Sequence, residues 1–219
     1  IAQREGRAKN SNDLTQPAIL KMMAMGGEGS IIDRLKQLHI APLAISYEYD
    51  PCDYLKAREY QLRRDIPYWK KTAEDDLESM LVGIKGYKGH IFYKCAPCID
   101  EWLDTVDEDL PKNKLFDAIA AHIDHEIHCN YKLYPVNYVA LDMIQDTRVY
   151  EEYYTAEDYQ NFNAYLDGQI EKIEIENRDD KFLRTCLLTQ YAYPAKNYIA
   201  ASSENGRFKS LLNRLTFKK

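Results

Sequence analysis

The sequence predicts an α/β fold, with a mixed sheet in the first two thirds of the chain and helices alone after it. Two mainly apolar runs of strand length, at 40–47 and 89–94, are the candidate strands, and the first is suited to a buried strand. Elsewhere apolar residues recur at helical spacing, and from Thr155 onward every pattern is helical. We therefore expect a sheet-containing domain over 1–150 and a helical extension over 151–219 packed on it.

The expected elements follow one another along the chain. Ile1–Arg4 is suited to the end of a strand, and Pro17 stands just inside a short helix, where its missing N–H is harmless. Ser30 can cap the next helix, and Thr72 and Thr155 can cap two of the helices that follow. Further helices are expected at 50–64, 73–85, 97–106, 112–130, 137–144, 156–170 and 181–192. Pro194 should break the last of these.

Composition places the protein among globular chains and excludes several classes. Hydrophobic residues make up 45% and charged residues 29% of 219, and no run of about 18 apolar residues occurs, so no membrane span is expected. The net charge of −6 argues against a general nucleic-acid binder, so we expect no nucleic-acid partner.

The chain opens at Ile1 without an initiator Met or a signal segment, as in a fragment or processed product. The 5 scattered cysteines favour free thiols in a reducing compartment such as the cytoplasm.

A basic segment near the N-terminus, Arg4-Glu5-Gly6-Arg7-Ala8-Lys9, is the first candidate site. Its clustered cations, and a glycine that lets backbone N–H groups approach a ligand, are the parts of an anion-binding loop. Arginine offers a two-pronged donor to phosphate oxygens, and lysine a mobile point charge. A solvated basic turn is the alternative interpretation.

Two blocks of the sequence, at 1–23 and 40–53, resemble the glycerolipid acyltransferases, which acylate glycerol 3-phosphate or 1-acylglycerol 3-phosphate. Gly6-Arg7-Ala8-Lys9 resembles the Gly-Arg-Ser-Arg form of the family's phosphate-binding block. The resemblance implies that Arg7 holds the phosphate, Lys9 assists it and Gly6 shapes the loop. Glu5 would orient Arg7 or cap the loop. A second alignment, on Glu5-Gly6, would put Ala8 where the arginine belongs.

The later block, Ile40-Ala41-Pro42-Leu43-Ala44-Ile45, resembles the family's strand with a central proline, which makes Pro42 the matching residue. The stretch 47–57 is similar to a bacterial branch of the family, and this similarity continues to about Asp142. The resemblance implies that 1–150 is the C-terminal part of an acyltransferase-type mixed sheet domain.

The implied activity is transfer of a fatty acyl group from acyl-CoA or acyl carrier protein to a glycerophosphate-type acceptor in phospholipid synthesis. The resemblance implies no cofactor, and the expected location is the cytoplasm or the inner face of the membrane. The family's catalytic base is a His followed a few residues later by an Asp that orients it. None of the 5 histidines here has an aspartate five positions on.

We therefore expect the catalytic block to lie upstream of Ile1, and these residues to hold part of the acceptor site while being inactive alone. No catalytic residue is assigned. The alternative class is a non-enzymatic phosphate-binding or protein-interaction module.

Two further clusters have metal-ligand residue types, but no metal is expected. His122, His125, Glu126 and His128 lie on a predicted helix, where the first and last histidines diverge by about 120°, so they do not comfortably meet one ion. Cys95-Ala96-Pro97-Cys98 has redox or zinc spacing but no second pair of cysteines, which favours half-buried thiols at a strand–helix junction.

Tyr68 and Trp69 precede Lys70-Lys71. Aromatic and basic side chains together suit lipid headgroups, so a peripheral membrane contact is one interpretation of this segment. Core packing of Trp69 is the other.

Overall fold

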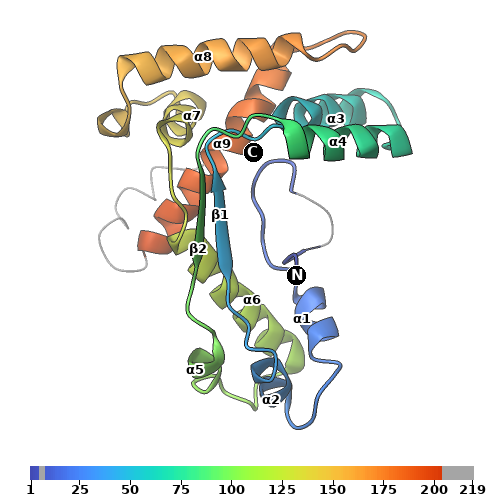
Figure 1. Ribbon diagram of the computed structural model, residues 1–219, viewed down its shortest axis with the longest axis vertical. Helices are drawn as coiled ribbons and strands as arrows, with labels where there is room; N and C mark the ends of the chain where they lie inside the picture. The colour runs from blue at the N-terminus through green and yellow to red at the C-terminus, as the bar shows by residue number, and fades with distance from the viewer. Residues whose placement is uncertain (5–7, 204–219) are drawn as a thin grey trace. The chain divides into compact units, whose positions relative to one another are not determined.

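The computed structural model describes residues 1–4 and 8–203 (Figure 1). The described chain divides into two compact units. Unit 1 contains residues 1–4, 8, 13–45 and 93–131, and unit 2 contains residues 9–12, 46–92 and 132–203. The predicted boundary near 150 does not coincide with this division, because side chains from both sides of it share the core of unit 2.

Unit 1 is a small helical cluster. Its helices are α1 (Pro17–Met23), α2 (Ile31–Lys36), α5 (Asp100–Leu103) and α6 (Lys112–Cys129). Helix α1 packs on α6, and α2 packs on α5. The helices bury their apolar faces in one core, where Leu35, Leu103 and Ile119 are fully enclosed. Ser30 caps α2 as predicted, with Asp33 completing the capping box.

Unit 2 is larger and also mainly helical. Its elements are α3 (Asp53–Asp65), α4 (Ala73–Lys85), α7 (Pro135–Gln145), the 3-10 turn η1 (Glu151–Tyr153), α8 (Ala156–Glu171) and α9 (Asp180–Ser203). Helix α9 packs along α7 and α3, and α8 packs against all three of these helices. The core between them contains Phe162, Leu166, Leu183 and Leu187, none of which is exposed.

A two-stranded sheet is formed by β1 (Leu43–Tyr47) and β2 (Ile91–Cys95) within the described residues, and the division between the units falls inside both strands. The Glu48 amide donates to the His90 carbonyl and the Ala96 amide to the Pro42 carbonyl. These pairs run in opposite directions along the two segments, so the sheet is antiparallel. The coarse prediction of a fold with both helices and strands is confirmed, with helices predominating.

The structure corrects three details of the sequence prediction. The run at 40–47 is predicted as a buried strand, but the outward side chains of β1 are about half exposed, at 46% for Leu43 and 42% for Ile45. Only one face of β1 is covered by other residues, so alternate side chains of the strand remain in contact with solvent. Residues 1–4 form no strand; instead the Gln3 carbonyl accepts a hydrogen bond from the Gln16 amide.

The third correction concerns Pro194, which lies inside α9 and does not end it. Proline lacks the N–H that would bond the preceding turn, which is why a break is expected there. The helix continues because residues on both sides of the proline, including Tyr191, Ala195 and Ile199, are buried in the core of unit 2.

Candidate functional site

The predicted phosphate site is only partly within the described chain. Glu5, Gly6 and Arg7 lie outside the described residues. Next to them, Ala8 is buried and its amide donates to the Asp13 Oδ1 atom at 3.1 Å. The Arg4 guanidinium lies 3.8 Å from the same oxygen. The Asp13 carboxylate therefore already binds one backbone donor and one cation of the basic segment.

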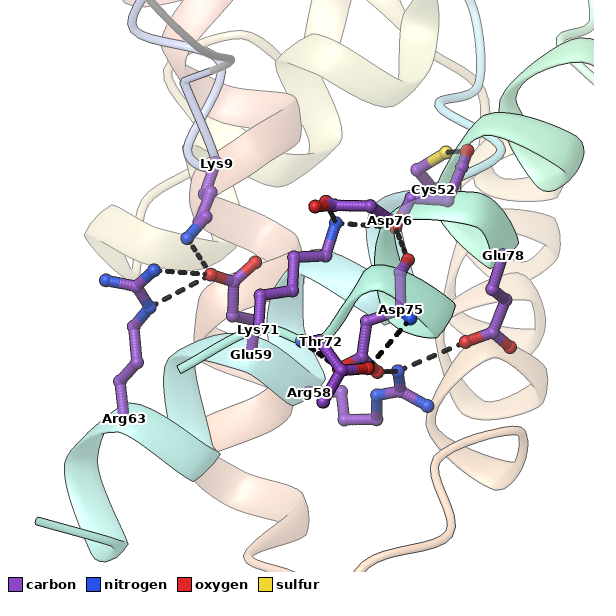
Figure 2. A network of polar contacts seen from close by, with 11 residues as sticks. Lys9, Cys52, Arg58, Glu59, Arg63, Lys71, Thr72, Asp75, Asp76 and Glu78 are labelled. Atoms are coloured by element: carbon purple, nitrogen blue, oxygen red, sulfur yellow. Dashed lines mark hydrogen bonds and ion pairs between the residues drawn. The ribbon is translucent and has the colours of Figure 1, made fainter. Parts of the chain in front are cut away.

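Lys9, in unit 2, is paired with a nearly buried carboxylate. Its ammonium nitrogen contacts the Glu59 Oε1 atom, and the Arg63 guanidinium donates to the same oxygen through Nε at 2.9 Å and Nη2 at 2.8 Å. Figure 2 shows both cations pointing at this one carboxylate from different segments. The Glu59 side chain is 8% exposed, so water screens these ion pairs less than it would at the surface.

The same polar network continues across α3 and α4 (Figure 2). Arg58 donates to Asp75 at 2.9 Å and to Glu78 at 3.2 Å, and Lys71 lies 2.8 Å from Asp76. Thr72 caps α4 in a capping box, as the sequence predicts. The labelled network pairs four basic side chains with four acidic ones, Glu59 included, so it carries no surplus positive charge for an anion.

Pro42 is buried and stands immediately before β1. Its carbonyl accepts the Ala96 amide at 2.8 Å, which starts the pairing of the two strands. Proline has no N–H to donate, so it fits the first position of a strand and limits pairing on its amide side. In this structure Pro42 sets where β1 begins.

A buried carboxylate at the start of α3 is a feature that sequence reasoning missed. Asp53 is fully buried, and its Oδ2 atom accepts hydrogen bonds at 2.6 Å from the hydroxyls of both Tyr165 and Tyr191. Tyr191 also accepts the Asp50 amide at 3.1 Å through its hydroxyl oxygen. These tyrosines come from α8 and α9, so the C-terminal helices hold the first turn of α3 in place.

Burial controls the ionisation of this group. It raises the pKa of Asp53 from 3.8 to about 6, although the two tyrosine hydroxyls favour the charged form and act against the shift. Burial, followed by the negative charge of Asp53, raises the pKa of Tyr165 and of Tyr191. Because Asp53 has no exposed surface, this cluster stabilises the helix packing of unit 2 rather than offering a site to a ligand.

The three histidines of α6 each have a different neighbour. The His122 ring stacks on Trp102, with centroids 3.8 Å apart, and burial lowers its pKa. The His125 Nε2 atom lies 3.6 Å from the Cys129 sulfur. His128 is buried with its ring 5.4 Å from that of Tyr131, and burial lowers its pKa despite the nearby Asp124. The helix therefore uses these rings mainly for packing.

A different set of metal-type residues comes together in unit 1. His39, Cys98 and Asp100 each offer a ligand atom, and the three atoms lie within 4.8 Å of one another. Within the described part of the chain no other group meets the same criterion. Sequence reasoning considered Cys98 but not its partners, because His39 lies about 60 residues earlier and only the packing brings it close. Cys95 and Cys98 are exposed rather than half-buried, which corrects that prediction.

The segment 68–71 and helix α4 form an exposed surface. Tyr68 is almost completely exposed, while Trp69 is partly buried with the Arg63 guanidinium 5.8 Å from its ring centroid. Along α4, four apolar side chains at helical spacing are at least half exposed: Leu77, Met80, Leu81 and Ile84. None of the described residues covers this apolar stripe of α4.

Comparison of the sequence and structure with models of known protein families, with curated proteins and with solved structures finds no match. Among the residues that the structure describes, no helix combines the length and the apolar character needed to cross a membrane.

Proposed function

We propose that this chain contributes the acceptor-binding part of a glycerolipid acyltransferase, with Arg7 as the residue that holds the acceptor's phosphate. The observation that carries the proposal is the ordered pair of sequence blocks, Gly6-Arg7-Ala8-Lys9 and 40–45. Two short motifs in the family's order are more specific than either alone. The later block overlaps β1, although Pro42 stands immediately before the strand and not at its centre.

In this proposal the residues of the basic segment have separate roles. The Arg7 guanidinium donates two hydrogen bonds to phosphate oxygens, Gly6 lets the backbone approach them, and Glu5 orients Arg7 or caps the loop. Lys9 is a secondary contact, because Glu59 already holds its ammonium group and a phosphate would have to compete with that carboxylate. The affinity for the phosphate therefore rests chiefly on Arg7.

The proposed reaction joins an acceptor hydroxyl to an acyl thioester. The hydroxyl oxygen attacks the thioester carbonyl, its proton passes to a general base, and the thiolate of acyl-CoA or acyl carrier protein leaves. None of the 5 histidines has the family's aspartate at the right spacing, so the proposal assigns the base to no residue of this chain.

The sheet supports the finer fold proposal, that this is part of an acyltransferase-type mixed sheet domain. A two-stranded sheet is only marginally stable alone, and an open apolar face or edge invites further pairing. The side chains of β2 are all exposed, among them Ile91, Phe92 and Tyr93, and the outward side chains of β1 are exposed as well. We propose that additional strands or helices of the family's domain cover this surface.

The apolar stripe of α4 supports a peripheral membrane contact. An enzyme that acts on lipids must reach the membrane surface, and an amphipathic helix lying in the interface inserts its apolar face among the headgroups. The exposed Tyr68, Lys70 and Lys85 flank the stripe and would suit the polar layer.

The test is a calorimetric titration of the 219-residue chain with glycerol 3-phosphate, glycerol and inorganic phosphate. The proposal predicts that glycerol 3-phosphate binds, that glycerol does not, and that inorganic phosphate binds more weakly than glycerol 3-phosphate. Equal binding of inorganic phosphate and glycerol 3-phosphate would instead indicate a phosphate-binding module without an acceptor site. Failure of both anions to bind would reject the proposal.

A further inference from the structure

We propose that His39, Cys98 and Asp100 form a zinc site in unit 1, in which Zn²⁺ is held by an imidazole nitrogen, a thiolate sulfur and a carboxylate oxygen. The site does not depend on the acyltransferase proposal. Its residues lie just after α2 and around the start of α5, away in sequence from the basic segment.

The distances suit one ion. The three ligand atoms lie within 4.8 Å of one another, and the His39 Nδ1 atom is 2.6 Å from the Asp100 Oδ2 atom. Zinc ligands at about 2.0–2.3 Å from the metal stand roughly 3–4 Å from each other. Binding therefore requires the distance between the His39 Nδ1 and Asp100 Oδ2 atoms to lengthen by about 1 Å. His39 is 78% exposed and Cys98 is exposed, so both side chains are free to make that adjustment.

The backbone holds the two ligand-bearing segments together before any ion arrives. The Ala96 amide donates to the Pro42 carbonyl at 2.8 Å, and the Ile99 amide donates to the Ile40 carbonyl at 3.0 Å. His39 itself has a φ of 48°, the left-handed region that residues other than glycine rarely adopt.

The second oxygen of the Asp100 carboxylate lacks a partner in the described structure. The Asp100 Oδ1 atom is buried and accepts no hydrogen bond within the described chain, while His39 and Cys98, the other two proposed ligands, are hydrogen-bond donors to the carboxylate. A buried carboxylate oxygen without a partner is unfavourable, and a cation removes that cost. Lys36 is close enough to influence Asp100 but is itself paired with Asp104, so its ammonium group does not satisfy this oxygen.

The chemistry of the three ligands selects the metal. A thiolate disfavours Mg²⁺ and Ca²⁺, which prefer oxygen ligands, whereas sulfur, nitrogen and oxygen together suit Zn²⁺. Three protein ligands leave a fourth tetrahedral position open for water. Cys95, three residues earlier, is exposed but is not part of the converging group.

The test is a competition titration of Zn²⁺ between the purified chain and a chromophoric chelator, together with the absorption spectrum after loading with Co²⁺. We expect one ion per chain, and a thiolate-to-cobalt charge-transfer band with the visible bands of tetrahedral Co²⁺. The variants Cys98→Ser and His39→Asn should weaken zinc binding at least tenfold; asparagine is chosen because it tolerates the left-handed backbone.

Two matched variants serve as controls. Cys95→Ser removes the neighbouring exposed thiol, and His90→Ala removes an exposed histidine whose Nδ1 atom is likewise 2.7 Å from a carboxylate, Glu48, outside the converging group. Both should bind zinc as tightly as wild type, and circular dichroism checks that each variant is folded.

The proposal is overturned if wild type binds no ion, if its cobalt spectrum lacks the thiolate band, or if a folded Cys98→Ser chain binds zinc like wild type. It is also overturned if binding is lost with His122→Ala and His125→Ala but kept with His39→Asn, because that pattern would assign the ion to α6.

Discussion

At the scale of single residues, the buried carboxylates Asp53 and Glu59 have opposite environments. Asp53 has only neutral donors at its side chain, namely two tyrosine hydroxyls and the Tyr54 amide, whereas Glu59 has two cations. A charge without a counter-charge is costly to bury, so the pKa of Asp53 rises. Each residue therefore gives a distinct prediction for stability.

For Asp53 the prediction is a pH dependence of unfolding. Its pKa is about 6 in the folded chain against 3.8 ordinarily, so the folded state holds the proton more tightly. The contribution of Asp53 to stability is therefore largest below about pH 4 and falls as pH rises to about 6, by about 3 kcal/mol in total. Asp53→Asn cannot titrate, so relative to wild type this variant should gain stability between pH 3.5 and pH 7.

Urea unfolding of wild type and Asp53→Asn at several pH values measures this difference. Asp50→Asn, a change of the same kind at a carboxylate paired with Lys56, is the control and should not reproduce the effect. A stability difference between wild type and Asp53→Asn that does not vary with pH would contradict the assignment.

For Glu59 the prediction is a loss of stability when its charge is removed. Glu59→Gln leaves Lys9 and Arg63 without their common counter-charge at a nearly buried position, and should cost about 1–3 kcal/mol in the free energy of unfolding. Glu78→Gln removes an exposed ion pair with Arg58 and should cost less than about 1 kcal/mol. Equal costs for the two variants would show that burial of Glu59 does not matter.

At the scale of elements, helix α9 shows that packing in the core of unit 2 can overcome the tendency of proline to end a helix. Proline inside a helix costs about 3 kcal/mol in an isolated helix. Pro194→Ala restores the missing backbone donor and should raise the free energy of unfolding by about 1–3 kcal/mol. Thr185→Ala, at an exposed position of the same helix, reports the gain from alanine alone, about 0.5 kcal/mol. An unchanged or lower stability of Pro194→Ala would mean that the helix is adapted to its proline.

The apolar stripe of α4 gives the second prediction at this scale. The double change Leu77→Glu with Leu81→Glu should reduce cosedimentation of the chain with vesicles of phosphatidylcholine and phosphatidylglycerol to background. Met22→Glu with Met25→Glu, at exposed apolar side chains of unit 1, should leave it unchanged. The result would contradict membrane contact if wild type does not bind vesicles and forms a dimer in light scattering that the Leu77/Leu81 change abolishes. That outcome would assign the stripe to self-association.

Elements could be predicted from the sequence where their signals are local. The caps at Ser30, Thr72 and Thr155 and the proline at the first turn of α1 are confirmed, because each involves residues within one turn of the chain. The contact of Asp53 with Tyr191, 138 residues apart, could not be predicted, nor could that of His39 with Asp100. Such pairs depend on tertiary packing, which no local pattern encodes.

At the scale of the whole molecule, the two units draw on interleaved segments of the chain. Residues 46–92 share unit 2 with the helices from 132 onward, so the C-terminal helices are integral to that unit's core. The sequence pattern places helices there correctly but carries no information on which earlier segments they cover. The phosphate hypothesis likewise rests on residues chosen by motif, of which the described chain contains Lys9 and Pro42.

The central claim is that Arg7 receives the phosphate of a glycerophosphate acceptor, and its most direct test is glycerol 3-phosphate affinity measured side by side for wild type, Arg7→Ala and Arg148→Ala. Arg148 is an exposed arginine elsewhere on the chain, so its removal changes net charge by the same amount. A charge-assisted hydrogen bond is worth about 1.5–3 kcal/mol, so Arg7→Ala should bind at least about tenfold more weakly, while Arg148→Ala should bind like wild type. Equal affinities for all three chains would contradict the claim.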